Sequence, residues 1–139
     1  MIFGLILTVI LLPFAGGLLL QLLKFKERKY KQFYIFSYVL LNTLLTYVLL
    51  SQGTTNLIRV INFAGEKLDF SFKIDGMSMV FAGLVATLWP LATLYSFPYM
   101  EHEHNGRVHE NIFYMFYTAT YGVTLGIAMS GNLLTMYCF

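Results

Sequence analysis

Glutamate and histidine alternate in one short polar stretch of the sequence, Glu101-His-Glu-His-Asn-Gly-Arg-Val-His-Glu110. Neutral imidazole and carboxylate groups are ordinary metal ligands, so one interpretation is a metal site. The spacing of these side chains matches no known closed site, and polar residues between two apolar segments are typical of a solvated turn. We therefore expect a solvated loop at 100–110 and no bound metal.

Other residue combinations that carry catalysis or bind cofactors are missing from the sequence. The single cysteine, Cys138, rules out an internal disulfide framework or a multi-cysteine metal cluster in these residues. We expect Cys138 to be a small buried apolar residue and not a reactive thiol. The sequence also contains no glycine-rich phosphate loop, no nucleophile beside a base, and no arrangement suited to haem or iron–sulfur ligation. We predict no catalytic residue and no cofactor.

The composition is that of a protein embedded in a lipid bilayer. Of the 139 residues, 58% are hydrophobic and only 12% are charged, whereas about 25% of the residues in a soluble domain are charged. The formal net charge of +2 is too small to indicate a nucleic-acid partner. We expect an integral membrane protein whose first partner is the bilayer, with no nucleic acid bound.

Uncharged segments long enough to cross the hydrocarbon core define the predicted fold, because a span needs about 20 residues. We predict an all-α polytopic membrane protein with one transmembrane region over 1–139. Its four spans lie at about 2–23, 32–52, 76–99 and 111–130.

The basic residues orient these predicted spans. Residues 24–31 contain five basic side chains and one acid, which places this loop in the cytoplasm and the N-terminus outside. The second loop, 100–110, is then also cytoplasmic. We expect phospholipid head groups as the partners of 24–31, with a specific lipid or protein site as the alternative. The location would be the cell membrane of a prokaryote.

An external β-hairpin is predicted at 57–75, between the second and third spans. Its expected strands, 58–63 and 68–74, flank a four-residue loop at 64–67. A lone hairpin is marginal in water. Its apolar face is therefore expected to lie on the helices or on a neighbouring subunit.

The hairpin leads directly into the third span through Ile74-Asp-Gly-Met-Ser78. Apolar and polar residues alternate up to Asp75, as in a half-buried strand. From Gly76 to Met100 no residue is charged. The change of period therefore predicts a strand-to-helix junction at the membrane surface.

Several residues inside the spans have predicted packing roles. Pro90 removes a backbone donor and crowds the residue four before it, so we expect a kink near Ala86, with a gating role as the alternative. The spacing of Gly122 and Gly126 permits close helix contact. Polar side chains near the middle of the second span are expected to hydrogen-bond between helices, each bond contributing under about 2 kcal/mol: Asn42, Thr43 and Thr46.

No Asp, Glu, Lys, Arg or His lies inside a predicted span. Ion pathways across membranes normally use such residues, so these residues alone should not pump protons. The apolar run 133–139 is too short to cross a bilayer. We expect it to be the first turns of a fifth helix, with its end covered by another chain, lying at the interface, or marking an incomplete product.

Several short stretches resemble one family, in this order: Ile74-Asp-Gly-Met-Ser78, Tyr95-Ser96, Tyr99-Met100 and Gly131–Tyr137. They resemble the N-terminal region of the antiporter-like subunits, the large proton-translocating membrane subunits of respiratory complex I, membrane-bound hydrogenases, formate hydrogenlyase and Mrp-type sodium/proton antiporters. The resemblance implies a proton path that uses a glutamate on the fifth helix and lysines on later helices, beyond Phe139. It also implies a structural signature at Asp75, Gly76 and Ser78, which we assign to the start of a helix and not to proton transfer.

These observations predict the N-terminal scaffold of a proton- or sodium-translocating antiporter-like subunit without its transport core. The parent would be a redox-driven membrane complex of the NADH dehydrogenase or hydrogenase type, and the chain a non-catalytic subunit of it. Partners would be other membrane subunits, including whatever supplies the remaining helices. Two alternatives are a small accessory membrane protein that transports nothing and a subunit fragment of an Mrp-type sodium/proton antiporter.

Overall fold

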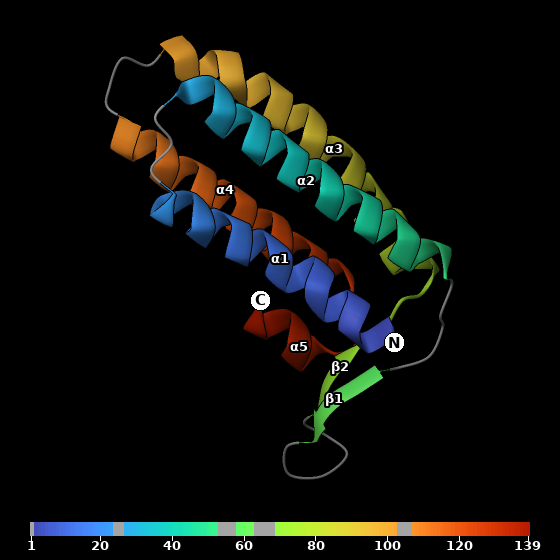
Figure 1. The fold of residues 1–139 in the computed structure, drawn as a ribbon. Coiled ribbons are helices and arrows are strands. Elements are labelled where there is room, and N and C mark those ends of the chain that lie inside the picture. Colours follow the sequence, from blue (N-terminus) through green and yellow to red (C-terminus); the bar gives the residue numbers. More distant parts are fainter. Residues whose placement is uncertain (1, 24–26, 53–57, 63–68, 103–106) are drawn as a thin grey trace.

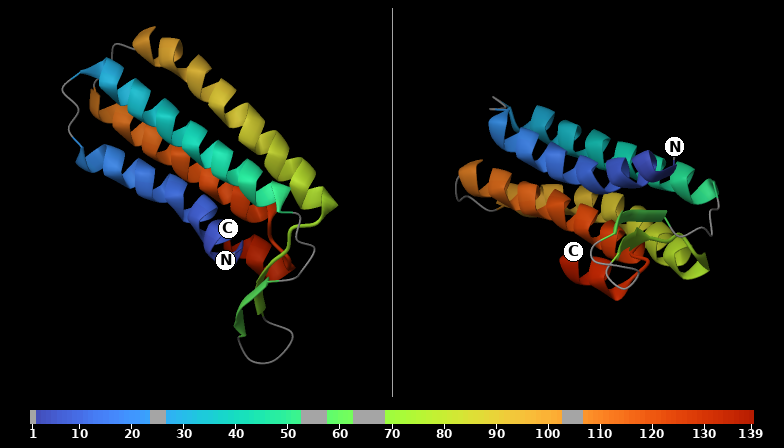
Figure 2. Two further views of the ribbon diagram at one scale, coloured as in Figure 1. Left: turned by 45° about the vertical axis from the view of Figure 1, so that its right-hand side comes forward. Right: turned by 90° about the horizontal axis from the view of Figure 1, so that it is seen from below.

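The computed structural model describes residues 2–23, 27–52, 58–62, 69–102 and 107–139, and these are mostly helical. The long helices are α1 (Ile2–Leu22), α2 (Arg28–Ser51), α3 (Gly76–His102) and α4 (Arg107–Ala128), and a short helix α5 (Leu133–Cys138) follows. Figure 1 shows the long helices side by side, with successive helices running in opposite directions. In the view from below in Figure 2, α1 and α2 form one layer and α4 and α3 the other.

Three helices in the described part of the chain are long and apolar enough to cross a membrane. They cover Gly4–Leu22, Lys29–Ser51 and Gly76–Met100. Helix α4 has 22 residues and packs beside α1, but it is not among these three. Helix α3 continues through Pro90 and Pro98, and the kink at Pro90 stays a prediction.

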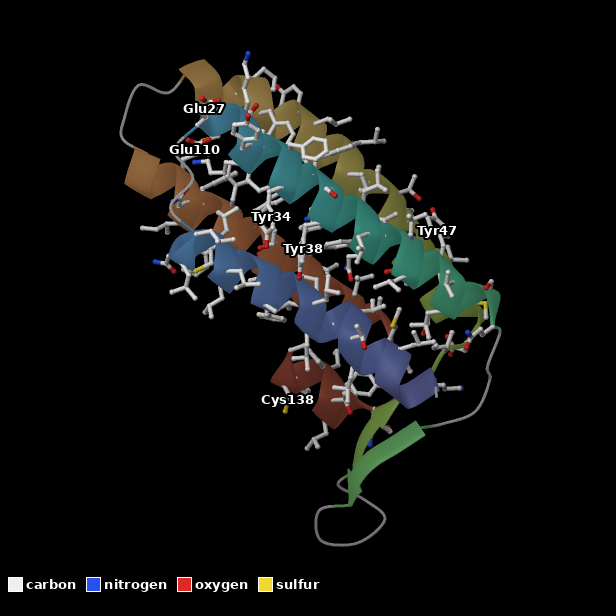
Figure 3. The ribbon with its side chains drawn as sticks, in the orientation of Figure 1. Glu27, Tyr34, Tyr38, Tyr47, Glu110 and Cys138 are labelled. Carbon is white, nitrogen blue, oxygen red and sulfur yellow. The ribbon has the colours of Figure 1, made fainter. Side chains whose placement is uncertain are left out.

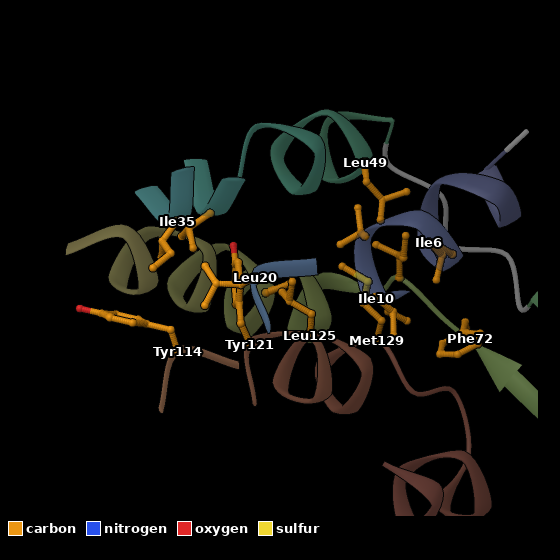
Figure 4. Close-up of a cluster of buried hydrophobic side chains, with 14 residues drawn as sticks. Ile6, Ile10, Leu20, Ile35, Leu49, Phe72, Tyr114, Tyr121, Leu125 and Met129 are labelled. Atoms are coloured by element: carbon orange, nitrogen blue, oxygen red, sulfur yellow. The ribbon is translucent and has the colours of Figure 1, made fainter. Parts of the chain in front are cut away.

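The core of the bundle is formed by one face of each of α1, α2 and α4 (Figure 4). Ile6 and Ile10 of α1, Tyr121 and Leu125 of α4 and Ile35 of α2 all belong to this buried cluster. Many of the other long apolar side chains point outward and are exposed. This pattern of an apolar interior and an apolar exterior suits helices surrounded by lipid, where hydrophobicity does not separate inside from outside.

Two short strands lie at the end of the bundle that holds the N-terminus and α5 (Figure 1). Strand β1 (Ile58–Asn62) pairs antiparallel with β2 (Asp69–Phe72), and the register shifts between Arg59 and Ile61. The predicted turn at 64–67 lies outside the described residues.

Backbone hydrogen bonds attach the end of β2 to the helices. The Ser71 N–H donates to the Thr135 hydroxyl of α5 at 3.0 Å. The Gly131 N–H donates to the Ser71 carbonyl at 2.8 Å, and the Lys73 N–H donates to the Met129 carbonyl at 2.9 Å. The segment that leads into α3 is therefore fixed against the end of α4 and against α5.

Two helices begin earlier than the sequence analysis predicted. Helix α2 starts at Arg28 and α4 at Arg107, so residues 28–31 and 107–110 are helical and our assignment of them to loops was wrong. The reason is that charged residues were taken to mark loops, whereas a helix can extend a turn beyond its uncharged part. This difference changes the environment of two charged side chains.

Candidate functional site

A buried ion pair joins α2 and α4 at the end of the bundle away from the strands. Lys31 Nζ lies 3.0 Å from Glu110 Oε2, and the two side chains are only 7% and 5% exposed. The same ammonium donates to Asn111 Oδ1 at 2.8 Å. Figure 3 shows Glu110 near the start of α2, far from Cys138 of α5. We predicted solvated or head-group-facing charges in both segments, and for these two residues that prediction was wrong.

The helical period explains why these two charges are inside. On α2 the buried face runs through Lys31, Ile35, Val39, Asn42, Thr46 and Leu49. On α4 it runs through Glu110, Tyr114, Thr118, Tyr121 and Leu125, and the series continues to Met129 just after the end of the helix. Both series step by three or four residues, as positions on one face of a helix do. Each charged residue lies in the first turn of its helix, at one end of the buried face. An isolated buried charge is costly, so each of these two charges needs the other as its partner.

A second polar contact lies deeper in the bundle, where α2 meets α3. Pro90 has no N–H, so the buried carbonyl of Ala86 loses the donor that an α-helix would normally supply four residues later. The Thr43 hydroxyl of α2 lies 3.2 Å from that carbonyl and also 3.0 Å from the carbonyl of Val39. A hydroxyl has one hydrogen, so Thr43 donates to one of these carbonyls at a time.

Aromatic residues of α4 extend this polar contact. The Tyr121 hydroxyl lies 3.0 Å from Thr43 Oγ1, and its ring stacks on Trp89 with centroids 5.1 Å apart. The Tyr117 hydroxyl donates to the Trp89 carbonyl at 3.2 Å and lies 3.2 Å from Thr93 Oγ1. Three helices are thus linked by neutral hydrogen bonds.

Asn42 lies in the same region but differs from Thr43 in the hydrogen bonding of its side chain. It is fully buried, and its carboxamide has no hydrogen-bond partner among the described residues. Thr46, one turn further on, donates its hydroxyl hydrogen to the Asn42 carbonyl at 2.8 Å. None of the groups in this cluster carries a charge.

Asp75 precedes α3 and accepts the hydrogen bond of its first turn. Asp75 Oδ1 accepts from the backbone N–H of Ser78 at 2.9 Å, and the Ser78 hydroxyl donates to the carbonyl of Lys73 at 3.2 Å. This is the geometry of a helix N-cap. The hydrogen bond from the Ser78 N–H holds the pKa of the Asp75 carboxyl below its ordinary value. Gly76 begins the helix, and a Cβ added to it would meet nothing.

The two glycines of α4 face different neighbours. A Cβ on Gly122 would lie 2.6 Å from the backbone oxygen of Ile10 on α1. A Cβ on Gly126 would instead lie 2.6 Å from the ring of Phe139. On α1, Gly16 and Gly17 likewise leave room for Tyr38 and Thr118. Several helix crossings therefore bring backbone close to a neighbouring chain segment.

The first candidates for chemistry in the sequence were the Glu and His residues of 101–110 and Cys138. These residues form no metal centre in the described part of the chain. The described residues contain no group of three metal-ligating side chains, and residues 103–106 of the Glu101–Glu110 stretch lie outside them. Cys138 is a free, exposed cysteine, so our prediction of a buried residue was wrong. Because α5 lies on the bundle through its other face, Cys138 points outward (Figure 3).

Comparison with known proteins finds similarity to antiporter-like proteins over part of the chain. Residues 61–108 match the family described as NADH-Ubiquinone oxidoreductase (complex I), chain 5 N-terminus. One subunit of the Na⁺/H⁺ antiporter of Alkalihalophilus pseudofirmus is 32% identical over 72 residues, which are 52% of this chain and 9% of that protein. The chain is related to the antiporter-like membrane subunits.

The matched region contains the junction between β2 and α3. Residues 61–108 include β2, the Asp75 cap and all of α3. Together with the three helices that are long and apolar enough to cross a membrane, this similarity indicates an integral membrane protein. The matched residues of the chain span only 9% of the length of that antiporter protein.

Sequence reasoning missed Lys31, Glu110 and Tyr121 as members of inter-helix contacts. The signal for the charged pair was present, since each lies four residues before a buried position of its helix, Ile35 and Tyr114. Tyr121 carried no such signal, because tyrosines are frequent throughout these helices.

Proposed function

We propose that this chain is the N-terminal scaffold of an ion-translocating, antiporter-like subunit in a multi-subunit membrane complex. The observation that carries the proposal is the match over 61–108, which coincides with the junction from β2 through Asp75 into α3. Protons or sodium would be the ion. The transport core would be supplied by further helices, and other membrane subunits would be the partners.

The polar contacts support a scaffold role for these residues. Thr43 lies within hydrogen-bond distance of the Ala86 carbonyl and of the Tyr121 hydroxyl. Tyr117 donates to the Trp89 carbonyl, and none of these side chains is charged at neutral pH. Lys31 and Glu110 are held in an ion pair at one end of the bundle. A relay across the membrane normally needs ionisable groups along its length. Asp75, as the cap of α3, is assigned to the start of the helix.

The proposed topology has the N-terminus and the two strands outside, in the cell membrane of a prokaryote. α4 would be the fourth span, since it packs along α1. The polar stretches 24–31 and 100–110 would then lie at the cytoplasmic side. The excess of basic residues in 24–31 supports this orientation.

The parent complex has two proposed types. The complex I description of the matched family supports a redox-driven complex of the NADH dehydrogenase or hydrogenase type. The similarity to part of an Na⁺/H⁺ antiporter supports a sodium/proton antiporter instead. The absence of charged residues from the middle of the helices favours, as a further candidate, an accessory protein that packs in a complex without any transport role.

Affinity purification of the tagged chain from its native membrane in mild detergent tests the proposal. We expect one large complex that contains polypeptides with antiporter-like helices and their charged residues, identified by mass spectrometry. A large complex without any antiporter-like polypeptide would favour the accessory candidate. A chain that migrates alone would contradict both.

A further inference from the structure

A groove of about 410 Å³ lies between α3 and α4, at the end of the bundle where β2 joins α3. Asp75, Ser78 and Ser130 form its polar end, and Phe81 and Ile127 belong to its apolar walls. Phe81 is 53% exposed and Ile127 is 41% exposed, so the groove is open to the surroundings of the helices. The polar end is at the helix ends and the apolar part extends toward the middle of the bundle.

The polar atoms of this groove accept hydrogen bonds and offer few donors. The Ser130 hydroxyl donates to the Ile127 carbonyl at 2.8 Å, and the Thr124 hydroxyl donates to the Thr120 carbonyl at 2.7 Å. The Ser78 hydroxyl donates to the Lys73 carbonyl. Each hydroxyl has a single hydrogen, so these oxygens present only lone pairs to an occupant.

A carboxylate adds negative charge to the same end. Asp75 is ionised at neutral pH, since the ordinary pKa of an aspartate is about 4 and the Ser78 N–H lowers it further. An ionised carboxylate only accepts hydrogen bonds. A group with several N–H donors and a positive charge fits this set of acceptors. An alkylammonium group has both properties.

Lys73 provides an opposite charge next to this site. Its Nζ lies 3.7 Å from Asp75 Oδ2, and the two side chains are 39% and 42% exposed. The exposed ammonium of Lys73 can contact an anion while it remains near Asp75. A zwitterion with an ammonium and a phosphate therefore matches the pair of charges at the polar end.

The length of the groove suits an extended hydrocarbon chain. The lining of α3 runs from Asp75 to Val85, which is about 15 Å of helix. Its apolar walls, which include Phe81 and Ile127, continue from the polar end along this length.

We propose that this groove binds one phosphatidylethanolamine molecule. Its ammonium group lies against Asp75 and the hydroxyl oxygens, its phosphate contacts Lys73, and one acyl chain lies along Phe81 and Ile127. Phosphatidylcholine has the same phosphate and tails but no N–H on its ammonium group. The site therefore distinguishes these two lipids through hydrogen bonding.

Photo-crosslinking of the full chain in its native membrane identifies the occupant. With p-benzoylphenylalanine in place of Phe81, we expect an adduct with phosphatidylethanolamine at a higher share than that lipid has in the membrane. The same label at Leu91, which is 59% exposed on α3 and outside the groove, should report the bulk lipid composition. A polypeptide adduct at Phe81, or the same lipid adducts at both positions, would overturn the proposal.

Native mass spectrometry of the full chain from nanodiscs with equal phosphatidylethanolamine and phosphatidylcholine tests the chemistry. We expect a preference of about tenfold for phosphatidylethanolamine, as one charge-assisted hydrogen bond supplies. Asp75→Asn should remove most of this preference while it keeps the cap, since Asn is an equally good N-cap. An unchanged ratio in D75N would overturn the proposal.

A second variant keeps the test independent of Asp75. Ala128→Phe places a ring in the groove, so we expect fewer bound molecules of both lipids. Ala92→Phe, at an exposed position of α3 outside the groove, is the matched control and should leave the bound lipid unchanged. Equal binding in A128F and A92F would contradict occupation of this groove.

Discussion

Lys31 of α2 and Glu110 of α4 form an ion pair at 3.0 Å, with both side chains almost fully enclosed by the protein. The pair connects helices that are separated in the sequence by β1, β2 and α3. Its partners come from the first turns of their helices, so it fixes how the ends of α2 and α4 lie against each other. It is a contact between scaffold elements at one end of the bundle.

Removal of one partner should destabilise the protein strongly, because the other charge would remain buried. We expect Glu110→Gln to lower the free energy of unfolding by about 3–5 kcal/mol, measured by denaturant titration in detergent micelles. The double variant Lys31→Met with Glu110→Leu should cost less than either single change. Lys29→Met, at an exposed position on the same helix, should change stability by less than about 0.5 kcal/mol. If E110Q and K29M behaved alike, the pair would not have the role described.

Thr43 should matter because of Pro90. Thr43→Val removes the donor to the buried Ala86 carbonyl and the contact with Tyr121, and should cost about 1–2 kcal/mol. In a Pro90→Ala background the Ala86 carbonyl regains a donor from its own helix, so the cost of T43V should fall. A double-mutant cycle of unfolding free energies measures this coupling. Additive effects would show that Thr43 and Pro90 act independently.

Gly122 should tolerate no side chain. A methyl group there would approach the Ile10 carbonyl oxygen to 2.6 Å, so Gly122→Ala should separate α1 from α4 and lower stability by about 1–3 kcal/mol. Gly4→Ala is the matched control, since a Cβ at Gly4 meets nothing, and Ala there should raise stability by about 0.5–1 kcal/mol. Thermal unfolding of both variants in the same detergent gives the comparison. A loss in G4A as large as in G122A would contradict this explanation.

The cap of α3 should make stability depend on pH. The pKa of Asp75 is lower in the folded protein than in the unfolded chain, so its contribution is fully present above the unfolded pKa of about 4. It is lost as the pH falls through the lower folded pKa. Unfolding measured from pH 7 to pH 3 should show a smaller acid loss in D75N than in the original protein. The same loss of stability at low pH in both proteins would show that groups other than Asp75 cause it.

The sequence was informative where its pattern changed and misleading where charge was used to mark loops. The change of period at Gly76 predicted the start of α3 at the residue where the helix begins. The charges of Lys31 and Glu110 hid the fact that both continue the buried faces of their helices. The partner of the Ala86 carbonyl also needed coordinates, since no spacing rule relates Thr43 to Pro90. The burial of Cys138 was predicted wrongly because which face of α5 lies on the bundle depends on the contact with β2.

Ion flux tests the central claim most directly, namely that these residues support transport without carrying it. The purified complex and the isolated chain would each be reconstituted into vesicles, and proton and sodium fluxes would be followed under an imposed gradient. We predict flux through the complex, no flux through the chain alone, and loss of flux when the chain carries the destabilising Glu110→Gln substitution. Ion flux through the isolated chain would contradict the account.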